Sequence, residues 1–248
     1  MILLEVTAVR KEFDGLRALD GVSFSAEGGE ILGIIGPNGA GKTTLFNLVS
    51  GLYSPTSGEI NFQGKSILRL KPHQISRLGI GRTFQIVRPF SNLDVETNVL
   101  VAIGHRFYPS LWESCGAFRQ PEILEEVQRF IDRAGLRSYA KQFAKNLPLG
   151  IKKRLEIARA LALKPRLLLL DEPSAGLRFE ESTQLMDLIR QVRDQDIGVL
   201  LIEHNMQVVM DLCERIVVLD HGSKIAEGSP EEIRSNPQVI QAYLGKET

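Results

Sequence analysis

The sequence contains few of the residues that build metal centres or disulfides. Its 248 residues include two cysteines, Cys115 and Cys213, and four histidines. The cysteines lie far apart, in no Cys-x-x-Cys or Cys/His spacing, and no His-Glu-x-x-His motif is present. We therefore expect two free thiols in a reducing compartment and no dedicated transition-metal site.

Long apolar runs and an excess of one charge are missing as well. Runs such as "LLLL" at 167–170 are far too short to cross a bilayer. The start, "MILLEVTAVRKEF", lacks the basic segment and long apolar stretch of a secretion signal. Thirty basic residues balance thirty acidic ones, which predicts no general attraction to nucleic acid or anionic lipid. We expect an intracellular protein that reaches a membrane, if at all, through partners.

What is present is the pattern of an α/β protein with a substantial core, since 43% of the residues are apolar. "ILLEVTAV" and "RALDGVSFSA" predict two strands separated by a turn at Asp14 and Gly15. "GEILGII" is an apolar strand, and "RLLLLDEP" and "IGVLLIEHN" flank the helix "EESTQLMDLIRQVRDQ". This strand–helix–strand order predicts a predominantly parallel sheet, preceded by an antiparallel β subdomain.

Helical patterns dominate the middle of the chain. "PEILEEVQRFIDRAG" begins with Pro121 and ends at Gly135, which is the usual order of these residues around a helix. "IKKRLEIARALAL" predicts a second helix, ended by Pro165. We predict a single domain, 1–248, in which a β core of 1–87 and 165–248 is interrupted by an α-helical subdomain at 88–164.

The segment "GPNGAGKT", residues 36–43, matches the G-x-x-x-x-G-K-[ST] pattern of a phosphate-binding loop. We call it the phosphate loop. Its glycines let backbone N–H groups turn toward phosphates, Lys42 can reach the β- and γ-phosphate oxygens, and the Thr43 hydroxyl can bind Mg²⁺. The loop follows a predicted strand and opens a predicted helix, so a chance glycine turn is disfavoured.

Two carboxylates and a histidine follow other predicted strands. Asp171 and Glu172 end "LLLLDE", where Asp171 can bind Mg²⁺ and Glu172 can orient the attacking water. His204 follows "GVLLIE", on the ligand side of a parallel sheet, and can bond a γ-phosphate. By itself His204 could be purely structural, and two solvated carboxylates would be the simplest interpretation of Asp171 and Glu172 without the loop upstream.

Together these motifs resemble the ATPase subunit of an ATP-binding cassette (ABC) transporter along essentially the whole chain. The resemblance rests on the phosphate loop, "GRTFQ", residues 147–161, "LLLLDEP" and His204. It implies a P-loop NTPase (RecA-like) fold and ATP and Mg²⁺ as cofactors. It also implies that Phe13 stacks on adenine and that Gln85 contacts Mg²⁺ and water. The implied contacts of the loop are Gly36, Pro37, Asn38, Gly39, Ala40, Gly41, Lys42, Thr43 and Thr44.

The resemblance further implies partners. These are a second ATPase subunit, membrane permease subunits docked on the helical subdomain and, indirectly, an extracytoplasmic solute-binding protein. The chain would then lie on the cytoplasmic side of the cell membrane. Aromatic residues within "GHRFYPSLWESCGAF" (104–118) could line the docking groove or belong to the subdomain core.

The segments "RTFQ", "RLEIARAL", "LLIEHNM" and "PQVIQAYLG" are most similar to those in the ATPase subunits of importers of branched-chain (hydrophobic) amino acids. An ATPase for urea or amide import, or for lipid or polysaccharide export, remains an alternative. A soluble ABC ATPase of translation or DNA repair is less favoured, because such proteins usually carry two cassettes or long coiled coils. A P-loop kinase would not be expected to contain the 147–161 stretch.

The resemblance also exposes two departures in segments that act on a partner's nucleotide. The signature, usually Leu-Ser-Gly-Gly-Gln, aligns here with Leu147, Pro148, Leu149, Gly150 and Ile151. The D-loop aligns with Ser174, Ala175, Gly176, Leu177 and Arg178, where Arg178 replaces the usual aspartate. Residues acting on the chain's own nucleotide are all present. This pattern predicts a heterodimer with two unequal sites, although the signature could equally be a tolerated variant.

Overall fold

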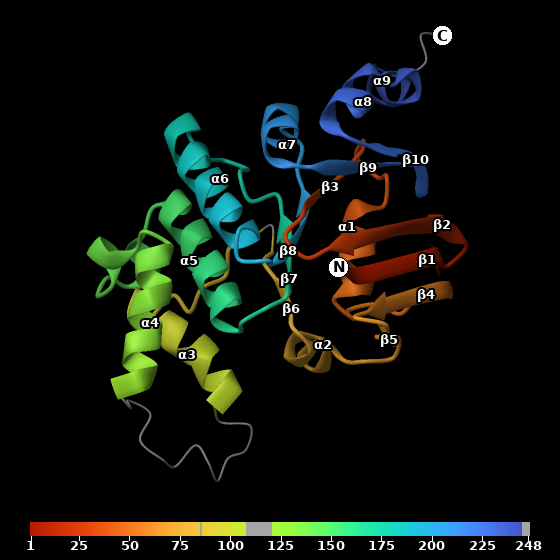
Figure 1. Ribbon diagram of the computed structural model, residues 1–248. Coiled ribbons are helices and arrows are strands. Elements are labelled where there is room, and N and C mark those ends of the chain that lie inside the picture. Colours follow the sequence, from red (N-terminus) through yellow and green to blue (C-terminus); the bar gives the residue numbers. More distant parts are fainter. Residues whose placement is uncertain (85, 108–120, 245–248) are drawn as a thin grey trace. The chain divides into compact units, whose positions relative to one another are not determined.

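The computed structural model describes residues 1–84, 86–107 and 121–244, which fold into two compact units. The first unit comprises Met1–Arg82, Arg166–Glu172 and Arg190–Thr248, and the second comprises Thr83–Pro165 and Pro173–Ile189. Figure 1 labels their elements. Gln85, Cys115 and most of the aromatic stretch at 104–118 lie outside the described residues.

An antiparallel sheet opens the first unit. Strands β1 (Ile2–Phe13) and β2 (Leu16–Glu27) form the predicted hairpin, with Asp14 and Gly15 both at positive φ. A second hairpin joins β4 (Ser57–Phe62) to β5 (Lys65–Ser66), and the strand order is β2-β1-β4-β5. The expected N-terminal antiparallel subdomain is confirmed.

The second sheet of this unit is mostly parallel, in the order β10-β9-β3-β8-β7-β6. Its strands are β3 (Ile31–Ile35), β6 (Ile80–Arg82), β7 (Leu167–Asp171), β8 (Gly198–Ile202), β9 (Arg215–Asp220) and β10 (Ser223–Gly228). Only the β9–β10 pair is antiparallel. Every residue of β3, β7 and β8 is buried, which is why these segments are apolar throughout. The predicted α/β class is confirmed.

One hydrophobic core joins the two sheets through α1 (Lys42–Val49). Phe46 of α1 is fully buried in the same cluster as Leu4 of β1 and Leu169 of β7. The helix that begins at the phosphate loop is therefore held on both sides by apolar packing, so its N-terminus has a fixed position in this unit.

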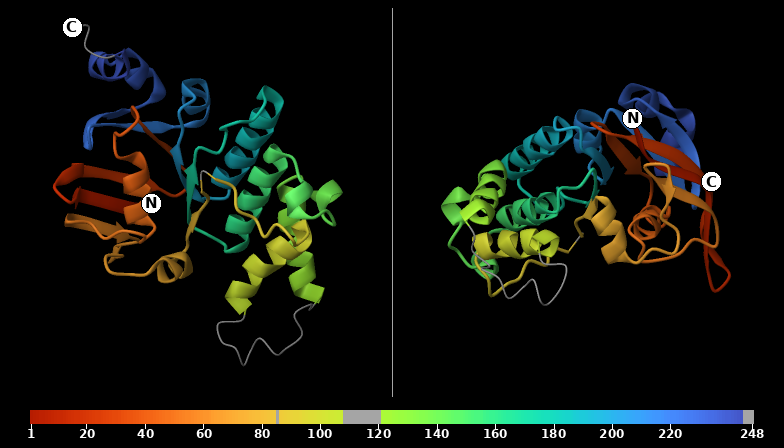
Figure 2. Two further views of the ribbon diagram at one scale, coloured as in Figure 1. Left: turned by 180° about the vertical axis from the view of Figure 1, so that it is seen from behind. Right: turned by 60° about the horizontal axis from the view of Figure 1, so that its bottom comes forward.

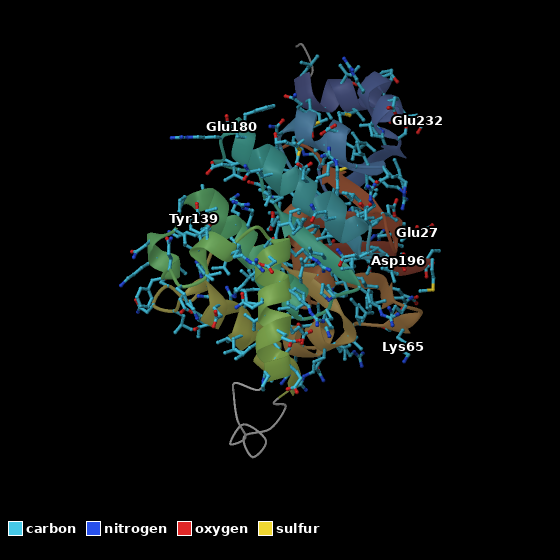
Figure 3. All side chains as sticks on the ribbon, turned by 60° about the vertical axis from the view of Figure 1, so that its left-hand side comes forward. Glu27, Lys65, Tyr139, Glu180, Asp196 and Glu232 are labelled. Atoms are coloured by element: carbon cyan, nitrogen blue, oxygen red, sulfur yellow. The ribbon has the colours of Figure 1, made fainter. Side chains whose placement is uncertain are left out.

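Short helices complete the first unit: α2 (Pro72–Leu78), α7 (Met206–Leu212), α8 (Pro230–Ser235) and α9 (Pro237–Leu244). Both views in Figure 2 show α8 and α9 beside the β9–β10 hairpin. Ser229 and Glu232 form a capping box at the start of α8. Glu232, like Glu180 at the start of α6, is labelled in Figure 3, and a carboxylate at either place favours the positive helix end.

The second unit is helical. It contains α3 (Val95–Phe107), α4 (Pro121–Arg133), η2 (Arg137–Tyr139), η3 (Ala144–Asn146), α5 (Leu149–Ala162) and all but the last turn of α6 (Phe179–Arg193). The apolar face of α4 is buried, and α3, α4 and α5 pack on one another. Residues 173–189 join this unit in addition to the expected 88–164. The proposed subdomain boundaries stay a prediction.

Candidate active site

The phosphate loop connects the end of β3 to the start of α1 and requires its glycines. Gly36, Gly39 and Gly41 all have positive φ, of 146°, 81° and 98°. A Cβ at Gly36 would overlap the Leu219 carbonyl oxygen, so no other residue fits there without moving β9. Pro37, Asn38 and Ala40 complete the turn, and Thr43 and Thr44 lie in the first turn of α1.

Lys42 is folded back onto the loop that precedes it. Its Nζ donates to the carbonyl oxygens of Gly36 at 2.6 Å and Pro37 at 2.9 Å. An ammonium has three protons, so one remains for a further acceptor. Burial lowers the pKa of Lys42, and the charges of Glu172 and Asp171 oppose this shift. The lysine and the two predicted carboxylates thus belong to one electrostatic site.

Asp171, the last residue of β7, forms a buried ion pair that the sequence did not predict. Its Oδ2 lies 3.4 Å from the Arg82 guanidinium, and both side chains are less than one-tenth exposed. Arg82 also donates to Asn47 Oδ1 at 2.8 Å and Ser50 Oγ at 2.7 Å, both in or next to α1. Burial raises the pKa of Asp171, and the positive charge of Arg82 opposes this shift. Arg82 therefore ties β6, β7 and α1 together at the site.

Glu172 has an unusual backbone conformation. Its φ is +49°, a sparsely populated region that costs a non-glycine residue about 1–3 kcal/mol. The surrounding strands impose it, because the Glu172 N–H donates to the Ile202 carbonyl at 2.9 Å. Strain of this kind is concentrated at functional sites.

His204 and Glu172 contact each other directly. His204 Nε2 lies 2.6 Å from Glu172 Oε1, so the two predicted catalytic side chains meet between the ends of β7 and β8. The backbone N–H groups of His204 and Asn205 both donate to Glu203 Oε2, at 3.1 and 3.5 Å. Glu203 is 2% exposed and shapes the turn that presents His204. Its place in "LLIEHN" was the available signal, and it was overlooked.

The oxygen donors at this site suit Mg²⁺. Mg²⁺ is usually held by one or two carboxylate or hydroxyl oxygens together with substrate phosphates, and seldom by an all-protein cage. Asp171 and the hydroxyl of Thr43 offer this set. Among residues 1–84, 86–107 and 121–244, no group of three or more His, Cys, Asp or Glu side chains could hold a metal by itself.

A turn of the second sheet supports the phosphate loop from outside. The Gly222 N–H donates to the Ala40 carbonyl at 3.2 Å, and the Asp20 N–H donates to the Gly222 carbonyl at 2.8 Å. Phe13 lies at the end of β1, with its ring edge-on to Tyr53. The first unit thus contains every predicted residue of the chain's own nucleotide site except Gln85, which lies outside the described part of the chain. The assignment of these residues to one site stays a prediction.

The predicted signature lies in the second unit, at the start of α5. Pro148 is the N-cap and, as a proline, offers no side-chain acceptor to the helix. Leu147 precedes it, and Leu149 opens the helix with 42% of its surface exposed. Gly150 and Ile151 are buried. The expected helix N-terminus is present, so its first N–H groups have no partner within the helix.

The predicted D-loop lies against this helix within the same unit. Gly176 has φ +76°, and a Cβ there would come 3.1 Å from Leu149. A turn joins the Leu177 N–H to the Ser174 carbonyl at 3.1 Å, with Ala175 between them. The Arg178 N–H donates to Glu181 Oε2 at 3.0 Å, and Glu181 also fills the space beside Gly150. The two altered segments are therefore neighbours.

No helix in the described parts of the chain combines the length and apolar character needed to span a bilayer. Cys213 is buried, and burial raises the pKa of its thiol well above the ordinary value. The expected free thiol is confirmed for Cys213, whereas Cys115 lies outside the described residues.

Comparison with known proteins agrees with these observations. The family model of ABC transporters matches residues 19–175, and that of branched-chain amino acid ATP-binding cassette transporters matches 223–248. The high-affinity branched-chain amino acid transport ATP-binding protein BraF of Pseudomonas aeruginosa is 42% identical over 98% of both chains. The corresponding LivG protein of Salmonella typhimurium is 43% identical, again over 98% of both.

A solved structure agrees at the level of the fold. The crystal structure of the ADP conformation of an ATP-binding cassette of an ABC transporter has a TM-score of 0.87 and 29% identity, covering 99% of this chain and all of the other. The resemblance predicted from the motifs is confirmed. The chain therefore belongs to the ABC transporter family and is a nucleotide-binding, ATP-hydrolysing subunit of a transporter.

Proposed function

We propose that this chain binds ATP with Mg²⁺ at the phosphate loop, hydrolyses it with Glu172, and thereby powers import of branched-chain or related amino acids. The observation that carries the catalytic part is the 2.6 Å contact between Glu172 and His204, beside Lys42 and Asp171. These four side chains lie at or after the ends of β3, β7 and β8, which are adjacent in the sheet. Ligands of open α/β sheets bind at this edge.

The phosphate loop and α1 bind the triphosphate in this proposal. The N–H groups at the start of α1 and the partial positive charge of that helix end favour phosphate oxygens. Lys42 keeps one ammonium proton for a phosphate oxygen while its other two hold the loop closed. Thr44, one residue further into the helix, adds a hydroxyl at the same end.

Thr43 and Asp171 are the residues that would hold Mg²⁺, and Gln85 is a further predicted contact. When bound, the ion neutralises charge on the phosphate oxygens and orients them. Asp171 can serve while it bonds Arg82, because a carboxylate has about four acceptor positions and the ion pair uses one oxygen.

Glu172 orients the attacking water and accepts its proton. A glutamate 15% exposed is reachable by one water molecule while remaining in a poorly solvated setting. In this proposal His204, which contacts Glu172, donates a hydrogen bond to the γ-phosphate. Glu203 holds the backbone of that histidine, so the contact does not depend on side-chain packing alone.

The substrate and the membrane partners rest on the relatives. Two transport proteins named for branched-chain amino acids match this chain along almost its whole length. We infer that permease subunits bind the chain at the cytoplasmic face of the membrane, and that a solute-binding protein delivers the amino acid outside.

The test is transport by the assembled system. The chain would be purified with its permease subunits and reconstituted in vesicles with the solute-binding protein. We expect ATP-dependent uptake of leucine, isoleucine or valine, and none with the non-hydrolysable analogue of ATP. Glutamate and urea serve as matched control solutes. ATP-dependent uptake of urea alone, or export of lipid, would show that the substrate assignment is wrong.

We also propose that the chain works beside a different ATPase subunit, with two unequal nucleotide sites. Two features support this. Pro148 supplies no hydroxyl where the signature usually has serine, and one hydrogen bond to a charged group contributes about 1.5–3 kcal/mol. Arg178 stands where the D-loop usually has aspartate. Both segments act on the partner's nucleotide, so the partner's site would be bound less tightly than this chain's own.

A further inference from the structure

A second aromatic ring lies beside the predicted adenine contact. The ring centroids of Phe13 and Tyr53 are 5.2 Å apart, with their planes at 75°. The Lys11 ammonium lies over the Phe13 ring, 4.7 Å from its centroid, and 5.9 Å from that of Tyr53. Such edge-to-face and cation–ring contacts are attractive, so the three side chains hold one another in place.

These distances define how the Phe13 ring is approached. The two ring centroids and the Lys11 ammonium form a triangle, and its longest side joins Lys11 to Tyr53. The widest angle of this triangle is therefore at Phe13. With the ammonium over one face, Tyr53 therefore lies toward the rim of the Phe13 ring. Within the part of the chain that the structure describes, no other ring or cation lies against Phe13. Phe13 is half-buried, and we take its second face as the one on which a flat ligand would stack.

Hydrogen bonds fix the segment that carries Tyr53 to the end of β1. Lys11 Nζ donates to the Ser54 carbonyl at 3.0 Å. The Thr56 N–H donates to the Arg10 carbonyl at 2.8 Å, and the Glu12 N–H donates to Thr56 Oγ1 at 3.0 Å. Residues 52–56 therefore keep a constant position relative to Phe13.

The same segment is bonded to the helix that begins at the phosphate loop. The N–H groups of Leu52 and Tyr53 both donate to the Asn47 carbonyl, at 2.9 and 3.1 Å. Asn47 lies in α1, which begins at Lys42. Tyr53 is thus connected to the phosphate site by α1 and to the predicted base contact by its own ring.

We propose that Tyr53 is a positioning residue for the nucleotide base. Tyr53 holds the rim of Phe13, so that the free face of that ring receives the purine at a set distance from the phosphate loop. This inference rests on the proposed function of Phe13 and adds a residue that no motif contains. Tyr53 touches neither the triphosphate nor the reacting atoms, so its effect is confined to the base.

The alternative is that Tyr53 only holds the 52–56 segment in place. The two roles differ in what they do to a ligand without a base. If Tyr53 positions the base, its removal weakens the binding of ATP and does not change the binding of inorganic tripolyphosphate. If Tyr53 only holds the segment, its removal disturbs α1 and through it the phosphate loop, so the binding of both ligands is weakened.

The experiment is calorimetric titration of the full chain with MgATP and, separately, with magnesium tripolyphosphate. We expect Phe13→Ala to weaken ATP binding about tenfold, in line with base–aromatic stacking. Tyr53→Ala should weaken it about two- to tenfold, the range set by an aromatic pair. Tyr53→Phe keeps the ring and should bind ATP with wild-type affinity. Leu52→Ala, an exposed neighbour outside the ring cluster, is the matched control, and tripolyphosphate affinity should be the same in all variants.

The outcomes separate the two levels of the proposal. Wild-type ATP affinity in Tyr53→Ala, together with a loss in Phe13→Ala, would overturn the role of Tyr53 and leave that of Phe13 intact. Equal weakening of ATP and tripolyphosphate in Tyr53→Ala would overturn it as well. Unchanged ATP affinity in Phe13→Ala would overturn the proposed base contact itself. In steady-state hydrolysis, a base effect raises KM for ATP and leaves kcat unchanged.

Discussion

Substituting glutamine for Glu172 is expected to slow hydrolysis of the ATP held by this chain's own phosphate loop about 10²- to 10⁴-fold, the usual contribution of a general base. Glutamine keeps the size of the side chain and an oxygen for His204 Nε2, which lies 2.6 Å from Glu172 Oε1. It cannot accept a proton from water. Single-turnover hydrolysis by the assembled transporter measures the chemical step, and calorimetry checks that ATP affinity stays within about twofold. A single-turnover rate close to wild type would show that Glu172 is not the base.

The matched control is the glutamine variant of the corresponding glutamate in the partner ATPase. If the partner's site is bound by the altered 147–151 segment, it contributes less to turnover from the start. The Glu172 variant should then reduce total ATPase activity and amino-acid uptake more than the partner's variant does. Equal losses from the two substitutions would contradict the unequal sites and leave the catalytic role of Glu172 standing.

Substituting methionine for Arg82 is expected to cost about 3–5 kcal/mol of folding free energy, because it leaves a buried carboxylate without its cation. Asp171 and Arg82 are 6% and 8% exposed, so water cannot replace the lost partner easily. Hydrogen exchange of the peptide covering β7 measures the local effect. A peptide from α4 in the other unit is the internal control and should not change.

Two further measurements identify the ion pair as the cause. The double variant with Arg82→Met and Asp171→Asn should recover most of the loss, since no charge is then buried alone. The defect of the single variant should also shrink as the pH falls. Burial raises the pKa of Asp171, so the folded state binds that proton more tightly than the unfolded state. A defect of the same size at pH 8 and pH 5.5, unrelieved by Asp171→Asn, would show that packing, not charge, is responsible.

The parts of the site that follow from local patterns were predictable from the sequence. The phosphate loop needs glycines at fixed positions, so its motif can be recognised from the sequence alone. Gly36 and Gly41 of this motif adopt positive φ in the structure. Asp171 and Glu172 were found because apolar strands end at them and parallel strands share one functional edge. The alternation of strand and helix patterns was sufficient to predict a predominantly parallel sheet, although it did not give the order of the strands.

What the sequence did not reveal are contacts between distant segments. Arg82 and Asp171 are 89 residues apart, and nothing local to "GRTFQ" indicates that its arginine faces a carboxylate. Tyr53 lies in an ordinary turn-rich segment, and its contact with Phe13 depends on how α1 packs against β1. The assignment of residues 173–189 to the helical unit was also not predicted, because their helix pattern is the same as that of any crossover helix between parallel strands.

The signature illustrates a different limit. The sequence shows that Pro148 and Leu149 differ from the usual residues, and the structure adds that the helix still begins there, at Leu149. The strength with which this helix end binds a phosphate depends on the second subunit. The comparison of glutamate variants described above addresses that question directly.

The central claim is that the phosphate loop binds the triphosphate through Lys42, and calorimetric titration of the isolated chain with MgATP tests it most directly. We expect saturable binding at one site per chain, weakened about 10- to 100-fold in Lys42→Met, the range of a hydrogen bond to a charged group. Lys152→Met, at the start of α5 in the other unit, should bind ATP as the wild type does. An absence of binding heat in the wild type, or equal affinity in wild type and Lys42→Met, would contradict the claim.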